Sequence, residues 1–197
     1  FPTEKMCNWN TIGHFHPSQY LIMHALMFQT KVLRQSGVKL PEHTFYVDNL
    51  FSYQPLPYAK NLYYMDIDLY HYYLGREDQS VNEKVLMKRI DQQIRVTKLM
   101  LGYYDVTKIQ NRKLRHYMVR YLEIMMTVTS ILAIRSETEE NLKKKKELWQ
   151  YLKQQNFTLY MRLRWGFLGQ GVNLPGKGGR KVSIACYKIS QKFYGFN

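Results

Sequence analysis

Apolar residues recur at helical spacing through the second half of the chain. Leucine and isoleucine recur at spacings of four and seven residues after residue 81, which places them on one helix face: Leu86, Ile90, Ile94 and Leu101. Ser80, with Glu83 three residues later, forms a capping box at the start of this pattern. The pattern therefore predicts a helix from residue 81, and similar periodicity predicts two more over residues 112–134 and 137–155.

The end of the chain predicts a basic amphipathic helix over residues 180–193. Its apolar residues form one narrow stripe: Val182, Ala185, Cys186, Ile189 and Phe193. Three lysines share one flank of that stripe: Lys181, Lys188 and Lys192. The preceding segment, residues 169–179, holds five of the 11 glycines and is predicted to be a loop or linker.

The first part of the chain lacks long periodic patterns and predicts short elements. Residues 1–18 are expected to be coil. The apolar run 20–28 is short enough for a buried strand or a short helix, and the turn-like segments around it favour the strand. Thr30 is expected to cap a short helix over 31–35, which Gly37 ends in the left-handed conformation.

Further short elements are predicted between residues 42 and 75. Asp48 or Asn49 is a favourable N-cap for the helix that follows. Two aromatic-rich runs, 62–65 and 69–73, favour two short strands or one bent strand.

Length and composition fit a folded chain of one domain, or of one domain with an appendage. The 197 residues are enough to bury a core, and 45% hydrophobic and 15% aromatic residues argue against intrinsic disorder. The predicted fold class is mainly α with a small β element. Residues 1–80 carry the short elements, and residues 81–197 form a helical region with a basic amphipathic end.

Positive charge is concentrated in the helical half of the chain. The formal net charge is +14; residues 1–98 carry 11 basic and 9 acidic side chains, and residues 99–197 carry 18 and 6. The excess of positive charge on residues 99–197 indicates an anionic partner, such as nucleic acid, an anionic membrane surface or a phosphorylated substrate.

Other features bear on the compartment. Cys7 and Cys186 lie near opposite ends without metal or redox spacing, which favours a reducing compartment. No apolar run reaches the roughly 18 residues of a membrane span; the best covers residues 124–134. The chain begins at Phe1 without a secretion-signal pattern. We expect a cytoplasmic protein, soluble or peripheral on the inner face of the membrane, whose chain starts within a longer polypeptide.

Asp48 is the leading candidate for chemistry because it lies among aromatic residues at a boundary between loop and helix. Limited solvation would raise its pKa and suit it to act as a general base. The alternative is that Asp48 only caps the helix.

A set of residues in this region carries a family resemblance. Five features follow one another in order: Tyr46-Val47-Asp48, Phe51, Tyr70-His71-Tyr72, Arg76 and Ser80. This part of the chain resembles the C-terminal half of family-2 glycosyltransferases, which are inverting, nucleotide-sugar-dependent enzymes with an A-type fold. It is most similar to bacterial enzymes that build cell-surface polysaccharides. The likeness covers roughly residues 14–100, and Val47 stands where the family often has a Glu before the Asp.

The resemblance implies roles for several residues. Asp48 would take the proton from the acceptor hydroxyl as this oxygen attacks the anomeric carbon and displaces the nucleoside diphosphate. The resemblance also implies substrate-binding residues: Arg76 and Gln79 facing the diphosphate, Ser80 beside them, Phe45, Tyr46 and Tyr53 stacking on sugars, and His16 contacting the acceptor. A core role for the aromatic residues and a surface role for Arg76 are the alternatives.

The metal of such enzymes is not expected in this chain. Asp66-Ile67-Asp68 spells the family's D-x-D motif, whose carboxylates suit magnesium or manganese, but it follows Asp48 instead of preceding it by about a hundred residues. His14 and His16 near Cys7 lack a second ligand cluster. The resemblance implies that the nucleotide-binding half and its Mg or Mn belong to an absent N-terminal part, without which the chain would not catalyse transfer.

A non-enzymatic role is the alternative function. A basic helical module would bind nucleic acid or an anionic membrane, although no nucleic-acid motif accompanies the charge. Membrane contact is expected from Trp165 and from the lysines of the terminal helix, Lys181, Lys188 and Lys192. A solvated basic face opposite a core stripe is the third interpretation of the same charge.

Overall fold

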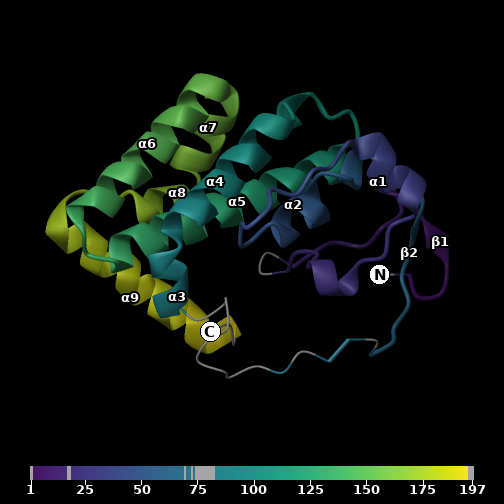
Figure 1. Cartoon of the computed structure of the whole chain (residues 1–197), viewed down its shortest axis with the longest axis horizontal. Helices are drawn as coiled ribbons and strands as arrows, with labels where there is room; N and C mark the ends of the chain where they lie inside the picture. The colour runs from purple at the N-terminus through teal and green to yellow at the C-terminus, as the bar shows by residue number, and fades with distance from the viewer. Residues whose placement is uncertain (1, 17–18, 69, 72, 74–82, 195–197) are drawn as a thin grey trace. The chain divides into compact units, whose positions relative to one another are not determined.

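The computed structural model describes residues 2–16, 19–68, 70–71, 73 and 83–194 (Figure 1). Within them the protein is mainly helical with a two-stranded antiparallel sheet, which confirms the coarse fold prediction. The chain divides into two compact units. The first comprises Phe1–Leu74 and Val106–Tyr121, and the second comprises Gly75–Asp105 and Leu122–Asn197.

The first unit combines short elements with the start of a long helix. Its strands β1 (Met6–Cys7) and β2 (Leu62–Tyr63) pair antiparallel, with Met6 opposite Tyr63 and Cys7 opposite Leu62. The helical elements are η1 (Met23–Ala25), α1 (Thr30–Ser36), α2 (Asp48–Tyr53), η2 (Leu56–Tyr58), η3 (Val106–Lys108) and the first turns of α5 (Arg112–Arg135). Leu50, Tyr53, Leu56 and Tyr121 are almost fully buried and form its core.

The described residues of the second unit form helices and the short segments that connect them. Its elements are α3 (Glu83–Lys88), α4 (Ile90–Tyr103), the remainder of α5, α6 (Glu139–Gln155), α7 (Phe157–Trp165), α8 (Phe167–Val172) and α9 (Gly176–Tyr194). Helix α6 packs against α4 and α7, and α8 packs against α7 and α9 (Figure 1). Leucine and methionine fill the core, and the most buried include Met100, Met126, Leu132, Leu148 and Leu152.

Polar side chains fix helix ends and link helices inside this core. Thr138 caps α6 by accepting from the Asn141 N–H, and Asn156 caps α7 by accepting from the Leu159 N–H. In the core, Trp149 Nε1 donates to Ser130 Oγ over 3.1 Å and thereby joins α6 to α5.

The predicted glycine loop over 169–179 is wrong, because α8 and the start of α9 occupy most of it. The glycines serve close packing. A Cβ built on Gly169 would lie 1.8 Å from the Leu163 carbonyl oxygen, and one on Gly179 would lie 2.7 Å from the Leu174 Cβ. Glycine content therefore marks tight turns here, where α8 begins close to the end of α7 and α9 begins close to the segment before it, as the residue without a Cβ permits.

The predicted strand over 20–28 is also wrong: this segment is irregular apart from η1. Tyrosine hydroxyls of α5 make hydrogen bonds to this segment, in place of the backbone hydrogen bonds that a neighbouring strand would make. The Leu21 N–H donates to the Tyr117 hydroxyl over 2.8 Å. The Tyr121 hydroxyl shares its one proton between the Leu21 carbonyl, 3.4 Å away, and Asn49 Oδ1, 3.1 Å away. The backbone of the segment is thereby paired without a neighbouring strand.

Several shorter predictions need correction at their boundaries. Strand β1 lies inside the segment expected to be coil, and β2 covers only two residues of the run 62–65. Of the run 69–73, the described residues Tyr70, His71 and Tyr73 form no strand. The helix expected from residue 81 is interrupted at Arg89, and its capping residue Ser80 lies outside the described residues.

The remaining helix predictions agree well with the structure. Helix α5 ends one residue beyond the predicted range, and α6 covers the predicted 137–155 apart from its first two residues. The basic amphipathic helix is confirmed as the greater part of α9. Gly37 ends α1 with φ of 60°, as expected, whereas Thr30 is the first helical residue and not its cap.

Candidate functional site around Asp48

Asp48 is the first residue of α2 and not its N-cap, a position that Val47 occupies. Two residues of the loop before it have a left-handed backbone conformation although neither is a glycine: His43 with φ of 49° and Tyr46 with φ of 69°. The Tyr46 carbonyl accepts from the Asn49 N–H over 3.2 Å and from Asn49 Nδ2 over 3.1 Å. These two hydrogen bonds to one carbonyl oxygen fix the path of the chain as it enters α2 at Asp48.

A cluster of tyrosines packs around Tyr121, whose hydroxyl contacts α2. The hydroxyl of the fully buried Tyr121 lies 3.1 Å from Asn49 Oδ1, to which it donates. The Tyr53 ring meets the Tyr121 ring edge to face at 5.7 Å, and the Tyr20 ring lies 5.0 Å from it. Tyr117 lies one helical turn earlier in α5, with its ring 6.1 Å from that of Tyr121.

The environment of Asp48 disfavours its charged form. Partial burial raises the pKa of this carboxyl above its ordinary value, while the N–H groups of Asp48 and Asn49 and the positive charge of His24 lower it by less. The negative charge of Asp48 in turn adds to burial in raising the pKa of the Tyr20 and Tyr121 hydroxyls. These mutual effects place Asp48, His24 and the two tyrosines in one electrostatic neighbourhood.

A half-buried carboxylate with a raised pKa binds a proton more readily than an exposed one. This property suits a group that accepts a proton from a hydroxyl during a reaction. The tyrosines hold the helix start in place, so the carboxylate belongs to a rigid element.

The other predicted substrate-binding residues fall into three groups. Phe45 is 41% exposed and its ring lies 6.2 Å from that of Tyr46, so these two rings remain next to Asp48 in the chain and accessible. Tyr53 is fully buried against Tyr121, which gives it a packing role and leaves no face for a sugar. His16 is exposed and its N–H donates to Gln19 Oε1. Arg76, Gln79 and Ser80 lie outside the described residues.

Sequence reasoning missed the residues that surround Asp48. His24 is exposed, and its ring lies 4.7 Å from that of Tyr70. Tyr117 and Tyr121 lie within the predicted helix over 112–134, but nothing in the sequence connects them to Leu21 or Asn49, which lie about a hundred and about seventy residues earlier. Such long-range pairs leave no periodic signal in a single sequence.

The D-x-D aspartates do not fit a metal site. Asp66 and Asp68 are both exposed, and Asp66 Oδ1 accepts from the Tyr64 hydroxyl over 3.1 Å. Among the described residues, no three His, Cys, Asp or Glu side chains gather closely enough to hold a metal ion.

An open groove of about 700 Å³ lies elsewhere, in the second unit. Its lining comes from α4 and α6 and contains none of the predicted site residues: Asp91, Ile94, Arg95, Lys98, Leu99, Gly102, Tyr103 and Tyr151.

No known protein supplies a function for the chain by similarity. Comparisons with protein-family models, with curated proteins and with solved structures found no match.

The predicted membrane-contact residues lie on exposed surface where the structure describes them. Lys181 and Lys188 of α9 are exposed, and the side chain of Lys192 lies outside the description. Trp165 is 58% exposed, with the Arg164 guanidinium 5.1 Å from its ring centre. Helix α5 has the length and composition of a membrane span, but 72% of its apolar window is buried, as in the core helix of a soluble protein.

Proposed function

We propose that this chain is the acceptor-side, catalytic-base half of an inverting glycosyltransferase that extends a cell-surface polysaccharide or a lipid-linked acceptor. The observation that carries the proposal is the half-buried carboxylate of Asp48 at the start of α2, with a pKa raised by burial. The order of residues around it supplies the family resemblance.

Asp48 acts as the general base in this proposal. One carboxylate oxygen accepts the proton of the acceptor hydroxyl while the hydroxyl oxygen forms a bond to the anomeric carbon. The bond from this carbon to the donor phosphate breaks, and its electron pair leaves with the nucleoside diphosphate. Attack and departure on opposite faces invert the configuration, and Asp48 later releases its proton to solvent.

The substrates divide between two parts of a longer polypeptide. The exposed ring of Phe45 and the half-buried ring of Tyr46 provide apolar faces for the acceptor sugar, while Arg76 and Gln79 contact the donor diphosphate. The donor nucleotide and its Mg or Mn bind mainly to a half that precedes residues 1–80. The present chain is therefore inactive alone.

Titration calorimetry tests this division. The chain and a longer polypeptide that includes a preceding nucleotide-binding half are each titrated with uridine diphosphate and its common sugars in the presence of manganese. We expect binding by the longer polypeptide and none by the chain alone. Absence of nucleotide binding to both would contradict the glycosyltransferase proposal.

Peripheral binding to an anionic membrane is a second proposed function, favoured by α9. Val182 and Ile189 are 51% and 54% exposed, and Cys186 between them is exposed as well. The inward face of the helix instead presents Ser183, whose hydroxyl donates to the Gly171 carbonyl over 2.6 Å. The apolar stripe of α9 is therefore not a core stripe in this unit.

An exposed apolar stripe beside Lys181 and Lys188 suits the interface of an anionic bilayer. Such binding would keep the enzyme at the inner face of the cell membrane, near a lipid-linked acceptor. Vesicle sedimentation tests it with Val182→Gln/Ile189→Gln, and with Val38→Gln, a partly exposed residue of the first unit, as control. We expect the α9 double variant to bind anionic vesicles more weakly; equal binding by all three proteins would contradict the proposal.

A further inference from the structure

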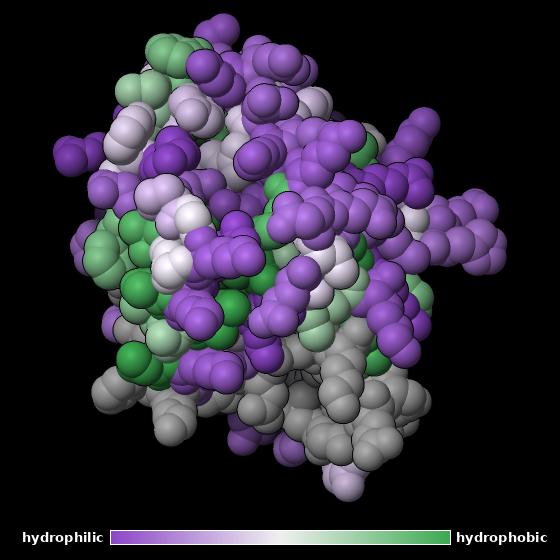
Figure 2. Space-filling model, turned by 90° about the vertical axis from the view of Figure 1, so that its left-hand side faces the viewer, coloured by the Kyte–Doolittle hydropathy of each residue, from purple (hydrophilic) through white to green (hydrophobic). Residues whose placement is uncertain are grey.

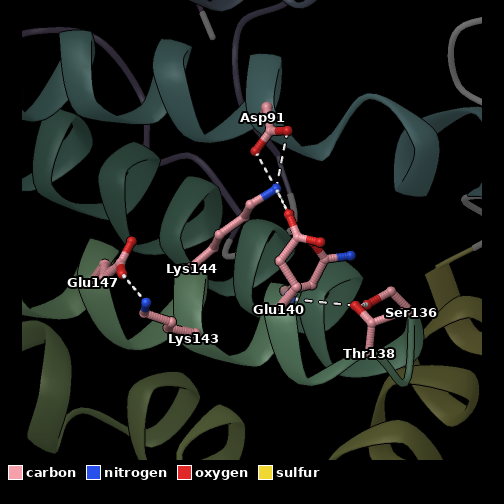
Figure 3. Close-up of polar contacts among 8 residues, drawn as sticks. Asp91, Ser136, Thr138, Glu140, Lys143, Lys144 and Glu147 are labelled. Carbon is pink, nitrogen blue, oxygen red and sulfur yellow. Dashed lines mark hydrogen bonds and ion pairs between the residues drawn. The ribbon is translucent and has the colours of Figure 1, made fainter.

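The open groove of about 700 Å³ in the second unit lies along α4 and α6. Two contacts set the alignment of these helices beside it. Lys144 Nζ lies 2.8 Å from Asp91 Oδ1 and 3.0 Å from Asp91 Oδ2 (Figure 3). Seven residues further along each helix, Lys98 Nζ lies 5.4 Å from the centre of the Tyr151 ring. The two helices therefore run in the same direction, over about 10 Å between these contacts.

The lining of the groove is mostly apolar. Ile94 is buried, Leu99 is 38% exposed, and the rings of Tyr103 and Tyr151 are half-buried. Gly102 leaves room for the end of the Tyr151 side chain, because a Cβ built there would lie 3.2 Å from the hydroxyl oxygen. A hollow of this size, with apolar and aromatic side chains and a few charged groups, has the composition of a small-molecule site.

The outer face of α6 has the opposite character. Its exposed side chains are hydrophilic: Lys143, Lys146, Glu147 and Gln150. Figure 2 looks onto the side of the molecule where α6 lies, and hydrophilic side chains gather over much of this face. The apolar groove therefore adjoins a hydrophilic surface, and an apolar group bound in it would remove the exposed part of Leu99 from water.

Two cations of α4 belong to the groove lining, Arg95 and Lys98. Lys98 Nζ lies over the Tyr151 ring, and no carboxylate of the described residues forms an ion pair with it. The lining contains one carboxylate, Asp91, which lies two helical turns before Lys98 and binds Lys144 through both oxygens. The part of the groove around Lys98 is therefore apolar and positively charged.

We propose that the groove along α4 and α6 binds a single-chain lipid whose headgroup is a phosphate monoester. Arg95 and Lys98 are three residues apart, so they are neighbours on one side of α4 and together match the roughly −1.5 to −2 charge of such a headgroup at pH 7. The alkyl chain covers Leu99 and the adjoining ring of Tyr103. The site belongs to the second unit alone and depends neither on the role of Asp48 nor on the apolar stripe of α9.

Lys98 can exchange its present contact for the headgroup. A cation over an exposed aromatic ring is held weakly, whereas a hydrogen bond between an ammonium and a phosphate oxygen is assisted by both charges. The guanidinium of Arg95 offers paired N–H donors to the same phosphate. Recognition therefore needs the anionic headgroup and the chain together.

Three probes separate the two parts of the ligand. Titration calorimetry on the full chain measures binding of decyl phosphate, of inorganic phosphate as the headgroup alone, and of decyl maltoside as the same chain under a neutral headgroup, with both amphiphiles below their micelle concentrations. We expect decyl phosphate to bind about tenfold more tightly than either of the others, or better. Equal affinity for one of the partial probes, or no binding of decyl phosphate, would overturn the proposal.

Variants place the ligand on the molecule. The site variants are Lys98→Gln and Leu99→Gln, and we expect each to bind decyl phosphate about tenfold more weakly. Lys143→Gln removes a lysine from the outer face of α6, and Val182→Gln/Ile189→Gln removes the apolar stripe of α9. We expect both controls to bind like the parent. Equal weakening by Lys143→Gln would attribute binding to net charge, and equal weakening by the α9 variant would attribute it to that stripe; either result would overturn the proposal.

Folding and the alternative partner are tested with the same proteins. Lys98→Arg keeps the charge and Leu99→Met keeps the apolar surface, so we expect both to bind decyl phosphate like the parent. We expect the two site variants to unfold at the parent temperature, because both side chains are partly exposed. Parent-like affinity of a folded Lys98→Gln would contradict the proposal. Binding of an oligouridylate that Lys98→Gln weakens, without binding of decyl phosphate, would replace the lipid by single-stranded nucleic acid.

Discussion

The Tyr121 hydroxyl donates a hydrogen bond of 3.1 Å to Oδ1 of Asn49, the residue that follows Asp48. Asn49 uses its other amide atom to donate to the Tyr46 carbonyl over 3.1 Å. One asparagine therefore joins the core helix α5 to the left-handed loop residue before α2. This pair fixes the start of α2, the helix whose first residue is Asp48.

Removing the Tyr121 hydroxyl should destabilise the fold measurably. We expect Tyr121→Phe to lower the free energy of unfolding by about 1 kcal/mol, the net value of one buried hydrogen bond. Asn49→Ala and the double variant complete a cycle, measured by urea denaturation, in which the two losses should not add. Tyr63→Phe, on a half-exposed ring of β2, is the control. Strictly additive losses would show that the two side chains do not interact.

The link between α5 and α6 gives a prediction for the second unit. Ser130 Oγ accepts from Trp149 Nε1 over 3.1 Å and donates to the Met126 carbonyl over 2.6 Å, in a fully buried position. We expect Ser130→Ala to lower the free energy of unfolding by about 1–3 kcal/mol, because it leaves the indole N–H buried without an acceptor.

The control for this variant is Ser190→Ala, since the Ser190 hydroxyl makes a similar bond to the Cys186 carbonyl on exposed α9. Its loss should change the stability by about 0.5 kcal/mol or less. Similar losses in the two variants would argue against the Trp149–Ser130 bond.

Local sequence patterns predicted the long helices and missed the elements held by distant contacts. Periodicity located α5 and α6 within two residues, because each buries one face along its whole length. The apolar run 20–28 carried no such information: its backbone is fixed by the Tyr117 and Tyr121 hydroxyls and not by a neighbouring strand. Its composition alone could not reveal partners a hundred residues away.

The residues of the candidate site were likewise predictable from the sequence only in part. Asp48 was identifiable from its place at a helix start among aromatic residues, and burial does raise its pKa as expected. The positive charge near it comes from His24, an exposed residue in an otherwise apolar run. Lys145 was indistinguishable from its three lysine neighbours in the sequence, because only the packing of the helices decides which lysine is half-buried and bonded to Asn173.

The raised pKa of Asp48 predicts a stability effect with a definite sign. A carboxyl whose pKa is higher in the folded than in the unfolded chain stabilises the fold when protonated, and this contribution is lost as the pH rises through the folded value. We expect Asp48→Asn to unfold at a higher temperature than the parent at pH 7. The difference should disappear well below pH 3.8, the ordinary value.

Thermal unfolding followed by circular dichroism across this pH range measures the effect. Asp68→Asn, which removes an exposed carboxylate, serves as the control and should show no such pH-dependent gain. A lower unfolding temperature for Asp48→Asn at pH 7 would mean that the charged carboxylate stabilises the fold, as a simple capping role requires.

The central claim is that Asp48 accepts the proton of the acceptor hydroxyl. Its most direct test is the turnover number of Asp48→Asn in a polypeptide that also contains the nucleotide-binding half, with Asp68→Asn as the matched variant. We predict that Asp48→Asn loses about 10²–10⁴ in kcat, the usual contribution of a general base, while the Kd for the nucleotide-sugar donor stays at the parent value. Retained turnover in Asp48→Asn, or an equal loss in Asp68→Asn, would contradict the claim.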